Sequence, residues 1–320
     1  MLREFGPPSH LSVADVPDPV PGTGQVLIDV AAAGITFVET QVRAGRGPNP
    51  AMAPELPMTP GNGVSGTVIA VGDGADPGLV GTLVVTTTGG SGGYAEQVAV
   101  DASQVIVVPP GLGPVEAVAL LADGRTAAGL FRAVDPQAGE WVLVEAAAGG
   151  VGSLLVQLAR SVGARVVAAA SSLAKLRIAG DLGADVLVDY TEPAWAQHVR
   201  DATGGRGVDV VFESVGGGVG TAAASLLADG GRLCVFGVAS GTPTTLDDDD
   251  LARRQVHVIG LGALAWSPAD MRALSQWALA ESAAGRLRPT IGQTFPLADA
   301  AVAHAAIEAR TTVGKTVLIP

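Results

Sequence analysis

Hydrophobic and polar positions follow two different patterns along this chain. Over the first hundred or so residues, short apolar runs alternate with Gly- and Pro-rich turns, a pattern typical of β-strands. The runs lie at residues 25–30, 66–71 and 82–87. Residues 45–60 contain five prolines and predict an irregular loop. We therefore expect this part of the chain to be all-β.

The pattern changes near Pro109-Pro110-Gly111, after which expected strands alternate with expected helices. This order predicts a parallel sheet with helices on both of its faces. The expected strands are 140–145, 165–170, 186–188, 208–212 and 232–236, with an edge strand at 255–261, and the expected helices are 153–162 and 175–182. After Trp266 the sequence predicts helices at 268–284 and 299–309 and a final strand at 315–319.

Composition narrows the class of protein. A chain of 320 residues with 48% hydrophobic and 16% charged residues has enough apolar surface for a sizeable core and two domains. The net charge of −12 and the scattered basic residues exclude a nucleic-acid partner. No apolar run reaches the roughly 18–20 residues that cross a bilayer, and the amino terminus lacks a signal-like stretch. We expect a cytoplasmic protein with no membrane partner.

Two local features are interpreted as structural. The single cysteine, Cys234, lies in an apolar run and is expected to be a small buried hydrophobic residue. It excludes an intramolecular disulfide framework and a Cys-rich zinc site. Residues 247–250 are four consecutive aspartates. We expect a solvated turn there, because four adjacent carboxylates cannot converge on one ion.

A Gly-rich turn at residues 142–152, reading VLVEAAAGGVG, joins an expected strand to an expected helix. Dinucleotide binding requires this order of elements, because a pyrophosphate must approach bare backbone and the free N–H groups of a helix start. Gly152 allows the helix to pack tightly, while Ala147 stands where the first glycine is usual. The alternative is a purely structural turn. The expected pyrophosphate-binding residues are Ala148, Gly149, Gly150 and Val151.

The residues after the next expected strand favour NADPH over NADH. An NAD-specific protein usually carries an acid there for the ribose hydroxyls, whereas this chain has Ser171 and Ser172, with Lys175 nearby. An acid would repel a 2′-phosphate, and two serines and a lysine can bind one. Tyr190, at the end of the third strand, is expected against the adenosine phosphate. The serines are also suited to cap the next helix, and both roles are compatible.

With these motifs in place, the sequence resembles the zinc-independent medium-chain dehydrogenases/reductases of the quinone oxidoreductase or zeta-crystallin type. The resemblance covers essentially the whole chain, and its specificity comes from the combination of motifs. These motifs are GITFVET at 34–40, PGNGVSG at 60–66, AAAGGVG at 146–152, ESVGG at 213–217, FGVASG at 236–241 and GKTVL at 314–318.

The resemblance implies an α/β fold with two domains. A GroES-like, β-rich catalytic domain would be built from residues 1–113 and 263–320, and a Rossmann domain with a doubly wound parallel sheet from residues 114–262. It also implies a homodimer joined through the strand near 255–261. The further cofactor-binding residues that it implies are Thr126, Val215, Phe236, Gly237, Val238, Ala239, Ser240, Leu261 and Lys315.

The chain departs from its relatives at the expected reaction centre. Zinc-dependent relatives carry a Cys around Thr36 and His-Glu where this chain has Asn62-Gly63, so we expect no metal, since such a site needs about three ligands. Related quinone reductases often carry Asn at Thr36 and Tyr at Gln41. These two positions are the catalytic candidates. Either they are tolerated pocket substitutions, or they adapt the pocket to another acceptor.

The function that fits is hydride transfer from NADPH to a quinone or an α,β-unsaturated carbonyl compound, because such acceptors need positioning more than acid–base help. An oxyanion would be stabilised by Thr36, backbone N–H groups or the ribose, and protonated by water. Two alternatives remain open. One is a stand-alone enoyl-thioester reductase of a biosynthetic pathway, and the other is a non-catalytic NADPH-binding protein.

Overall fold

The computed structural model describes residues 1–47 and 53–320, so residues 48–52 of the expected proline-rich loop lie outside the described part. The chain forms two compact units. The first unit comprises Met1–Gly124 and Ser275–Pro320, and the second comprises Arg125–Leu274. The boundaries fall inside two helices, α2 (Pro114–Val134) and α8 (Pro268–Ala283). None of the described helices has the length and apolarity that a bilayer crossing needs.

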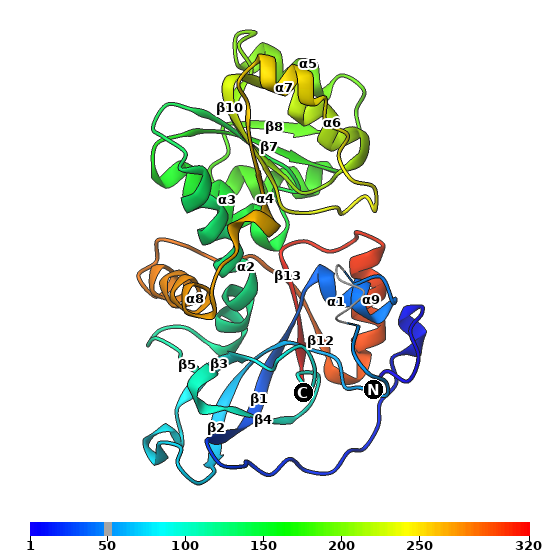
Figure 1. The fold of residues 1–320 in the computed structure, drawn as a ribbon, viewed down its shortest axis with the longest axis vertical. Coiled ribbons are helices and arrows are strands. Elements are labelled where there is room, and N and C mark those ends of the chain that lie inside the picture. Colours follow the sequence, from blue (N-terminus) through cyan, green and yellow to red (C-terminus); the bar gives the residue numbers. More distant parts are fainter. Residues whose placement is uncertain (48–52) are drawn as a thin grey trace. The chain divides into compact units, whose positions relative to one another are not determined.

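The first unit is built on a seven-stranded sheet of described residues with the order β12-β13-β1-β2-β3-β5, in which β4 also pairs with β1. The blue β1 and the red β13 lie side by side in Figure 1, so both ends of the chain contribute to one sheet. Side chains along a strand alternate between its faces, which places Val26, Ile28 and Val30 in the core. The strands are β1 (Gln25–Ile35), β2 (Gly63–Val71), β3 (Leu83–Thr87), β4 (Gln97–Asp101), β5 (Ile106–Val107), β12 (Ile291–Pro296) and β13 (Lys315–Ile319).

The second unit contains a six-stranded parallel sheet with the order β11-β10-β9-β6-β7-β8. The strand order reverses at β6, where doubly wound sheets bind their ligands at the carboxyl ends of the strands. This confirms the Rossmann-type sheet that the alternating pattern predicts. The strands are β6 (Trp141–Val144), β7 (Arg165–Ala170), β8 (Val186–Asp189), β9 (Val208–Glu213), β10 (Leu227–Val235) and β11 (His257–Gly260).

Helices connect these strands. In the second unit they are α3 (Gly150–Ser161), α4 (Leu173–Asp181), α5 (Trp195–Ala202), α6 (Gly217–Ser225) and α7 (Asp248–Arg253), and in the first unit α1 (Phe37–Arg43) and α9 (Ala300–Glu308). The helix α1 contradicts the expected all-β character of the first hundred residues. The β-branched and aromatic residues of α1 give its sequence the pattern of a strand. Thr36 and Glu39 nevertheless form a capping box at the start of the helix.

The aspartates at 247–249 are exposed to solvent, as expected. The expected turn is wrong, because Asp247 caps α7 and the next three aspartates form its first turn. Carboxylates are favourable at a helix amino terminus, where unpaired N–H groups carry partial positive charge. Asp250 in addition pairs with Arg254 at 2.7 Å. In contrast, Cys234 is fully buried and unpaired, as expected, and burial raises the pKa of its thiol to about 12.

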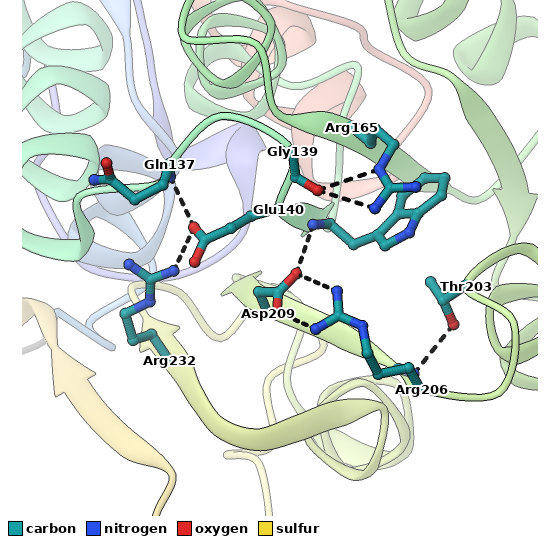
Figure 2. A network of polar contacts seen from close by, with 10 residues as sticks. Gln137, Gly139, Glu140, Arg165, Thr203, Arg206, Asp209 and Arg232 are labelled. Atoms are coloured by element: carbon teal, nitrogen blue, oxygen red, sulfur yellow. Dashed lines mark hydrogen bonds and ion pairs between the residues drawn. The ribbon is translucent and has the colours of Figure 1, made fainter.

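An ionic network joins strand beginnings in the second unit (Figure 2). Asp209 accepts a hydrogen bond from the Trp141 backbone at 2.8 Å and pairs with Arg206 at 2.7 Å. The guanidinium of Arg165 lies over the Trp141 ring, 4.4 Å from its centroid, and Arg232 pairs with Glu140. These charged groups lie at or near the amino ends of the strands, whereas the Gly-rich loops follow the carboxyl ends.

Candidate functional site

The Gly-rich turn after β6 has a shape that larger side chains would destroy. Ala146 takes a φ of +45°, and its carbonyl accepts a hydrogen bond from the Gly149 N–H at 2.7 Å. A Cβ on Gly152 would lie 2.4 Å from the Ala146 carbonyl oxygen and 3.1 Å from the Ala147 Cα. The helix α3 therefore approaches the turn this closely only because position 152 is a glycine.

The amino terminus of α3 suits a pyrophosphate. Gly149 is its N-cap and provides no side-chain acceptor for the first N–H groups of the helix. Such N–H groups, at the positive end of a twelve-residue helix, attract an anion. Ala148 is buried, while Gly150 and Val151 are partly exposed. The turn thus combines bare backbone with unused donors, and its residues fit a dinucleotide.

The serine pair after β7 caps the next helix, which is one of the two roles expected of it. Ser172 is the N-cap of α4, and its hydroxyl accepts from the Lys175 backbone N–H at 3.4 Å. The Lys175 ammonium donates to the Ser171 hydroxyl at 3.2 Å, so these two side chains form one polar, cationic group. Tyr190 follows β8, and its N–H donates to the Ala170 carbonyl at 3.1 Å. A 2′-phosphate would find hydroxyl and ammonium donors here, and no acid at position 171.

Two further loops are bound to each other at the carboxyl ends of β9 and β10. Ser240 N–H donates to the Val215 carbonyl at 2.7 Å, and Ala239 N–H donates to the Ser214 carbonyl at 3.0 Å. Position 237 must be a glycine, because a Cβ there would lie 2.7 Å from the Ser214 carbonyl oxygen. The structure therefore brings together residues 213–217 and 236–240, which the sequence assigned to the same end of the cofactor.

Three other cofactor candidates lie on elements other than these loops. Thr126 lies in α2 and is half-buried, and Leu261 begins a short 3-10 helix and is 38% exposed. Lys315 lies in the first unit at the start of β13, where it is 3% exposed and pairs with Asp123 at 3.1 Å. The ion pair with Asp123 gives Lys315 a structural role that sequence reasoning missed.

A partly buried polar group forms at the start of α1 in the first unit. The Thr36 hydroxyl donates to Glu39 Oε2 at 2.9 Å, and the same oxygen accepts from the Thr36 N–H. Glu39 Oε1 accepts from the Asn62 N–H at 2.8 Å. Burial raises the pKa of the Glu39 carboxyl, although these N–H donors and the charge of Lys315 oppose the shift. Thr36 is thus linked directly to a carboxyl that holds its proton more tightly than usual.

Sequence reasoning quoted Glu39 within a motif but gave it no role. The signal was present, because Thr at the N-cap with Glu three residues later is the capping-box pattern. The second catalytic candidate, Gln41, donates to the Thr40 hydroxyl at 3.1 Å and accepts from Arg46 at 3.4 Å. Its amide is therefore engaged on the helix surface.

Potential metal ligands do not gather in the described residues, where no three His, Cys, Asp or Glu side chains are placed to hold an ion. His304 is buried and hydrogen-bonds the Tyr94 hydroxyl at 2.9 Å. Burial lowers the pKa of His304 to about 4 and raises that of Tyr94 well above its ordinary value. This pair is neutral and structural near neutral pH.

A separate cavity of about 990 Å³ lies in the first unit. Residues 11–19 and 94–97 line it together with the end of β12 and the chain terminus, and neither Thr36 nor Gln41 is among its lining residues. Its position does not coincide with the catalytic candidates.

Comparison with known proteins adds the family. The model of the alcohol dehydrogenase GroES-like domain matches residues 22–110, and that of zinc-binding dehydrogenases matches residues 150–280. The quinone oxidoreductase of Pseudomonas aeruginosa is 33% identical over 99% of this chain and 97% of that protein. The chain belongs to the quinone oxidoreductase family of the medium-chain dehydrogenases/reductases.

Two more relatives of this chain extend the comparison. The 2-haloacrylate reductase of a Burkholderia species is 33% identical over 100% of this chain and 98% of that protein. The structure of Escherichia coli quinone oxidoreductase complexed with NADPH is 27% identical, covers 100% of this chain and 98% of that one, and gives a TM-score of 0.89. These findings confirm the resemblance and the combination of a Rossmann sheet with a GroES-like domain.

Proposed function

We propose that this protein reduces quinones or α,β-unsaturated carbonyl compounds with NADPH. The single observation that carries the proposal is the combination of the bare Gly149–Gly152 turn with the Ser171–Lys175 cationic group, at neighbouring strand ends of one Rossmann sheet. The E. coli relative that contains NADPH and the quinone oxidoreductase relatives support the cofactor and the acceptor class.

NADPH would supply a hydride when bound. Backbone N–H groups at the start of α3 would bind its pyrophosphate, and Ser171, Ser172 and Lys175 its 2′-phosphate, with Tyr190 against the adenosine. The remaining residues that would hold the cofactor are Thr126, Ala148, Gly149, Gly150, Val151, Val215, Phe236, Gly237, Val238, Ala239, Ser240, Leu261 and Lys315.

The Thr36–Glu39 pair would neutralise the negative charge that forms on the acceptor oxygen by supplying a proton. In the protonated form of Glu39, Oε2–H would donate to Thr36 Oγ1, the reverse of the hydrogen bond in the structure. That proton would move to Thr36 Oγ1 while the Thr36 hydroxyl proton passes to the acceptor oxygen. The Glu39 carboxylate that remains is stabilised by the N–H groups of Thr36 and Asn62 and regains a proton from water. This relay gives the reaction a proton source, although the chain has Thr36 and Gln41 where related quinone reductases often carry Asn and Tyr.

The proposal includes no zinc. The residues Thr36, Asn62 and Gly63 stand where zinc-dependent relatives carry Cys, His and Glu, and a catalytic zinc needs about three such ligands. Without a Lewis acid, removing the proton of a saturated alcohol is difficult, whereas quinones and conjugated carbonyls already accept electron density. Acceptors of the second kind are therefore the substrates that fit.

We expect NADPH deuterated at C4 to transfer deuterium to the β-carbon of an enone product. Quinone reduction should show a primary isotope effect if hydride transfer limits the rate. Exhaustive chelation is the control and should leave turnover unchanged. Robust oxidation of a saturated alcohol without quinone or enone reduction would contradict the proposal, as would one zinc per chain lost together with activity. Tight NADPH binding with no turnover on any acceptor would favour a non-catalytic protein.

Replacing Thr36 tests the proton source. Thr36→Val removes the hydroxyl at nearly constant volume and is expected to lower kcat on a quinone by about 10²-fold, the lower end of general acid–base contributions. Thr36→Ser keeps both hydroxyl and helix cap and should stay within a few-fold of the wild type. The measurement is kcat and KM for the quinone in each variant, compared among proteins whose NADPH affinities are the same. Wild-type kcat in Thr36→Val would assign protonation to water alone.

A second acceptor class has specific support. The 2-haloacrylate reductase relative acts, by its name, on an activated C=C bond next to a carboxylate. Reduction of such a bond also places negative charge on an oxygen, and the Thr36–Glu39 pair would supply a proton to that oxygen. An enoyl-thioester belongs to the same chemical class. The acceptor panel above should therefore include a haloacrylate and an enoyl-thioester beside the quinones.

We also propose that two copies associate through β11. This strand is at the edge of the six-stranded sheet, and its Val258 side chain is 48% exposed. An unpaired strand edge offers backbone donors and acceptors to a second chain.

A further inference from the structure

Two glutamates lie side by side beneath the loops at the strand ends of the second unit. Glu145 directly follows β6 and Glu213 ends β9, and these two strands are neighbours in the sheet. Both side chains have no exposed surface. Buried carboxyl groups are costly unless they are paired or neutralised, so their presence at this point requires an explanation.

Each carboxyl holds part of the loop that follows β9. Glu145 Oε2 accepts from the Ser214 N–H at 3.1 Å and from the Val215 N–H at 3.0 Å, and Glu213 Oε1 accepts from the Gly216 N–H. A Cβ on Gly216 would lie 2.3 Å from the Thr242 carbonyl oxygen, so the close approach of this loop to Thr242 requires a glycine at position 216. The carbonyls of Ser214 and Val215 in this loop also accept hydrogen bonds from the 236–240 loop and hold it in place.

The other oxygen of each carboxyl lacks a donor. Glu145 Oε1 and Glu213 Oε2 are both buried without a hydrogen-bond partner. The two side chains interact directly: the charge of Glu213 raises the pKa of Glu145, while a hydrogen bond from Glu145 favours the ionised form of Glu213. One proton held between the two free oxygens would satisfy both oxygens and leave the pair with a single charge.

Few other groups face this pair. The Cys234 thiol on β10 lies within reach of the charge of Glu213, and the Thr244 hydroxyl lies beside the Glu213 carboxyl. Neither group carries a positive charge. Among the described residues, no cation forms an ion pair with either carboxyl. A shared proton is therefore the available means of avoiding two adjacent buried charges.

We propose that Glu145 and Glu213 share one proton and act as positioning residues, which hold the 214–217 and 236–240 loops in the conformation that binds NADPH. The proposal rests on the proposed NADPH function and deepens it. Loss of the shared proton leaves two buried carboxylates that repel each other. The N–H bonds to Ser214, Val215 and Gly216 then cannot all persist, and the cofactor loops lose their support.

The direction of the pH effect follows from the electrostatics. Burial, and then the charge of Glu213, raise the pKa of Glu145 from its ordinary 4.5 to about 8. Because the folded value lies above the unfolded one, folding takes up a proton between them. The stability that the proton contributes is complete below the unfolded pKa and is lost as pH rises through about 8. The NADPH affinity of the folded protein follows the folded pKa and should fall above about pH 8.

The test measures the NADPH dissociation constant by fluorescence titration from pH 6 to 9.5. In the wild type it should be constant below pH 8 and rise about tenfold per pH unit above that value. Glu145→Gln provides a permanent amide proton where the shared proton lies. It should match the wild type near pH 7 and stay flat to pH 9.5. Glu192→Gln, the same change at an exposed position of this unit, should follow the wild type.

A second measurement needs no cofactor. The apo protein's thermal midpoint should fall more steeply between pH 5 and 9 in the wild type than in Glu145→Gln. The infrared band of protonated carboxyl groups should be stronger in the wild type, by the contribution of one carboxyl, than in Glu145→Gln, since Glu39 contributes equally to both. If Glu145→Gln does not fold, Glu213→Gln replaces it. Equal pH slopes in wild type and variant overturn the proposal. If NADPH binds at no pH, the proposed function fails. The thermal midpoints and infrared spectra of the apo protein then decide by themselves whether Glu145 and Glu213 share a proton.

Discussion

Gly152→Ala is expected to weaken NADPH binding by about 100-fold. The added Cβ would lie 2.4 Å from the Ala146 carbonyl oxygen and 3.1 Å from the Ala147 Cα, and backbone atoms cannot rotate away. The start of α3 must move relative to the turn. The loss of one or two charge-assisted hydrogen bonds to phosphate, at roughly 1.5–3 kcal/mol each, accounts for the expected effect. Isothermal titration with NADPH measures it.

The matched control is Gly218→Ala in α6. A Cβ at position 218 meets no atom within 4 Å, so this variant should bind NADPH normally and be no less stable than the wild type. Gly152→Ala should also lose about 1–3 kcal/mol of unfolding free energy through overpacking. Normal NADPH affinity in Gly152→Ala would show that the close approach of α3 to the turn is structural and not part of the cofactor site.

Ser171→Asp is expected to lower NADPH affinity roughly 10–150-fold, the equivalent of one lost charge-assisted contact. The new carboxylate would stand against the 2′-phosphate and would also pair with Lys175, whose ammonium now donates to Ser171 at 3.2 Å. Affinity for NADH, which lacks this phosphate, should stay the same or rise. The measurement is kcat/KM with each cofactor and one quinone.

Ser171→Asn separates charge from size. Asparagine has the shape of aspartate without its charge, and it should reduce NADPH affinity only a few-fold. Ser172 remains the cap of α4 in both variants, so helix stability is held constant. If the wild type already binds NADH as tightly as NADPH, the assignment of Ser171, Ser172 and Lys175 to the 2′-phosphate is wrong.

Much of the fold was predictable because its signals are local. The strands 165–170 and 315–319 were expected at the bounds that the structure has, since apolar runs between turns identify buried strands. The cofactor turn was predictable for the same reason, because small residues between a strand and a helix reflect a backbone requirement. Helix α1 was missed, although its capping box was readable, because its β-branched residues imitate a strand.

The sequence by itself determined where backbone must be bare and where strands alternate with helices, because both depend on neighbours along the chain. Only the tertiary structure decided which charges meet. Glu145 accepts from Val215, 70 positions away, and Lys315 pairs with Asp123 across 192 positions. The cost of burying a charge depends on every group packed around it. A strand-end glutamate therefore shows a raised pKa only after β6 and β9 have come together and excluded water from it.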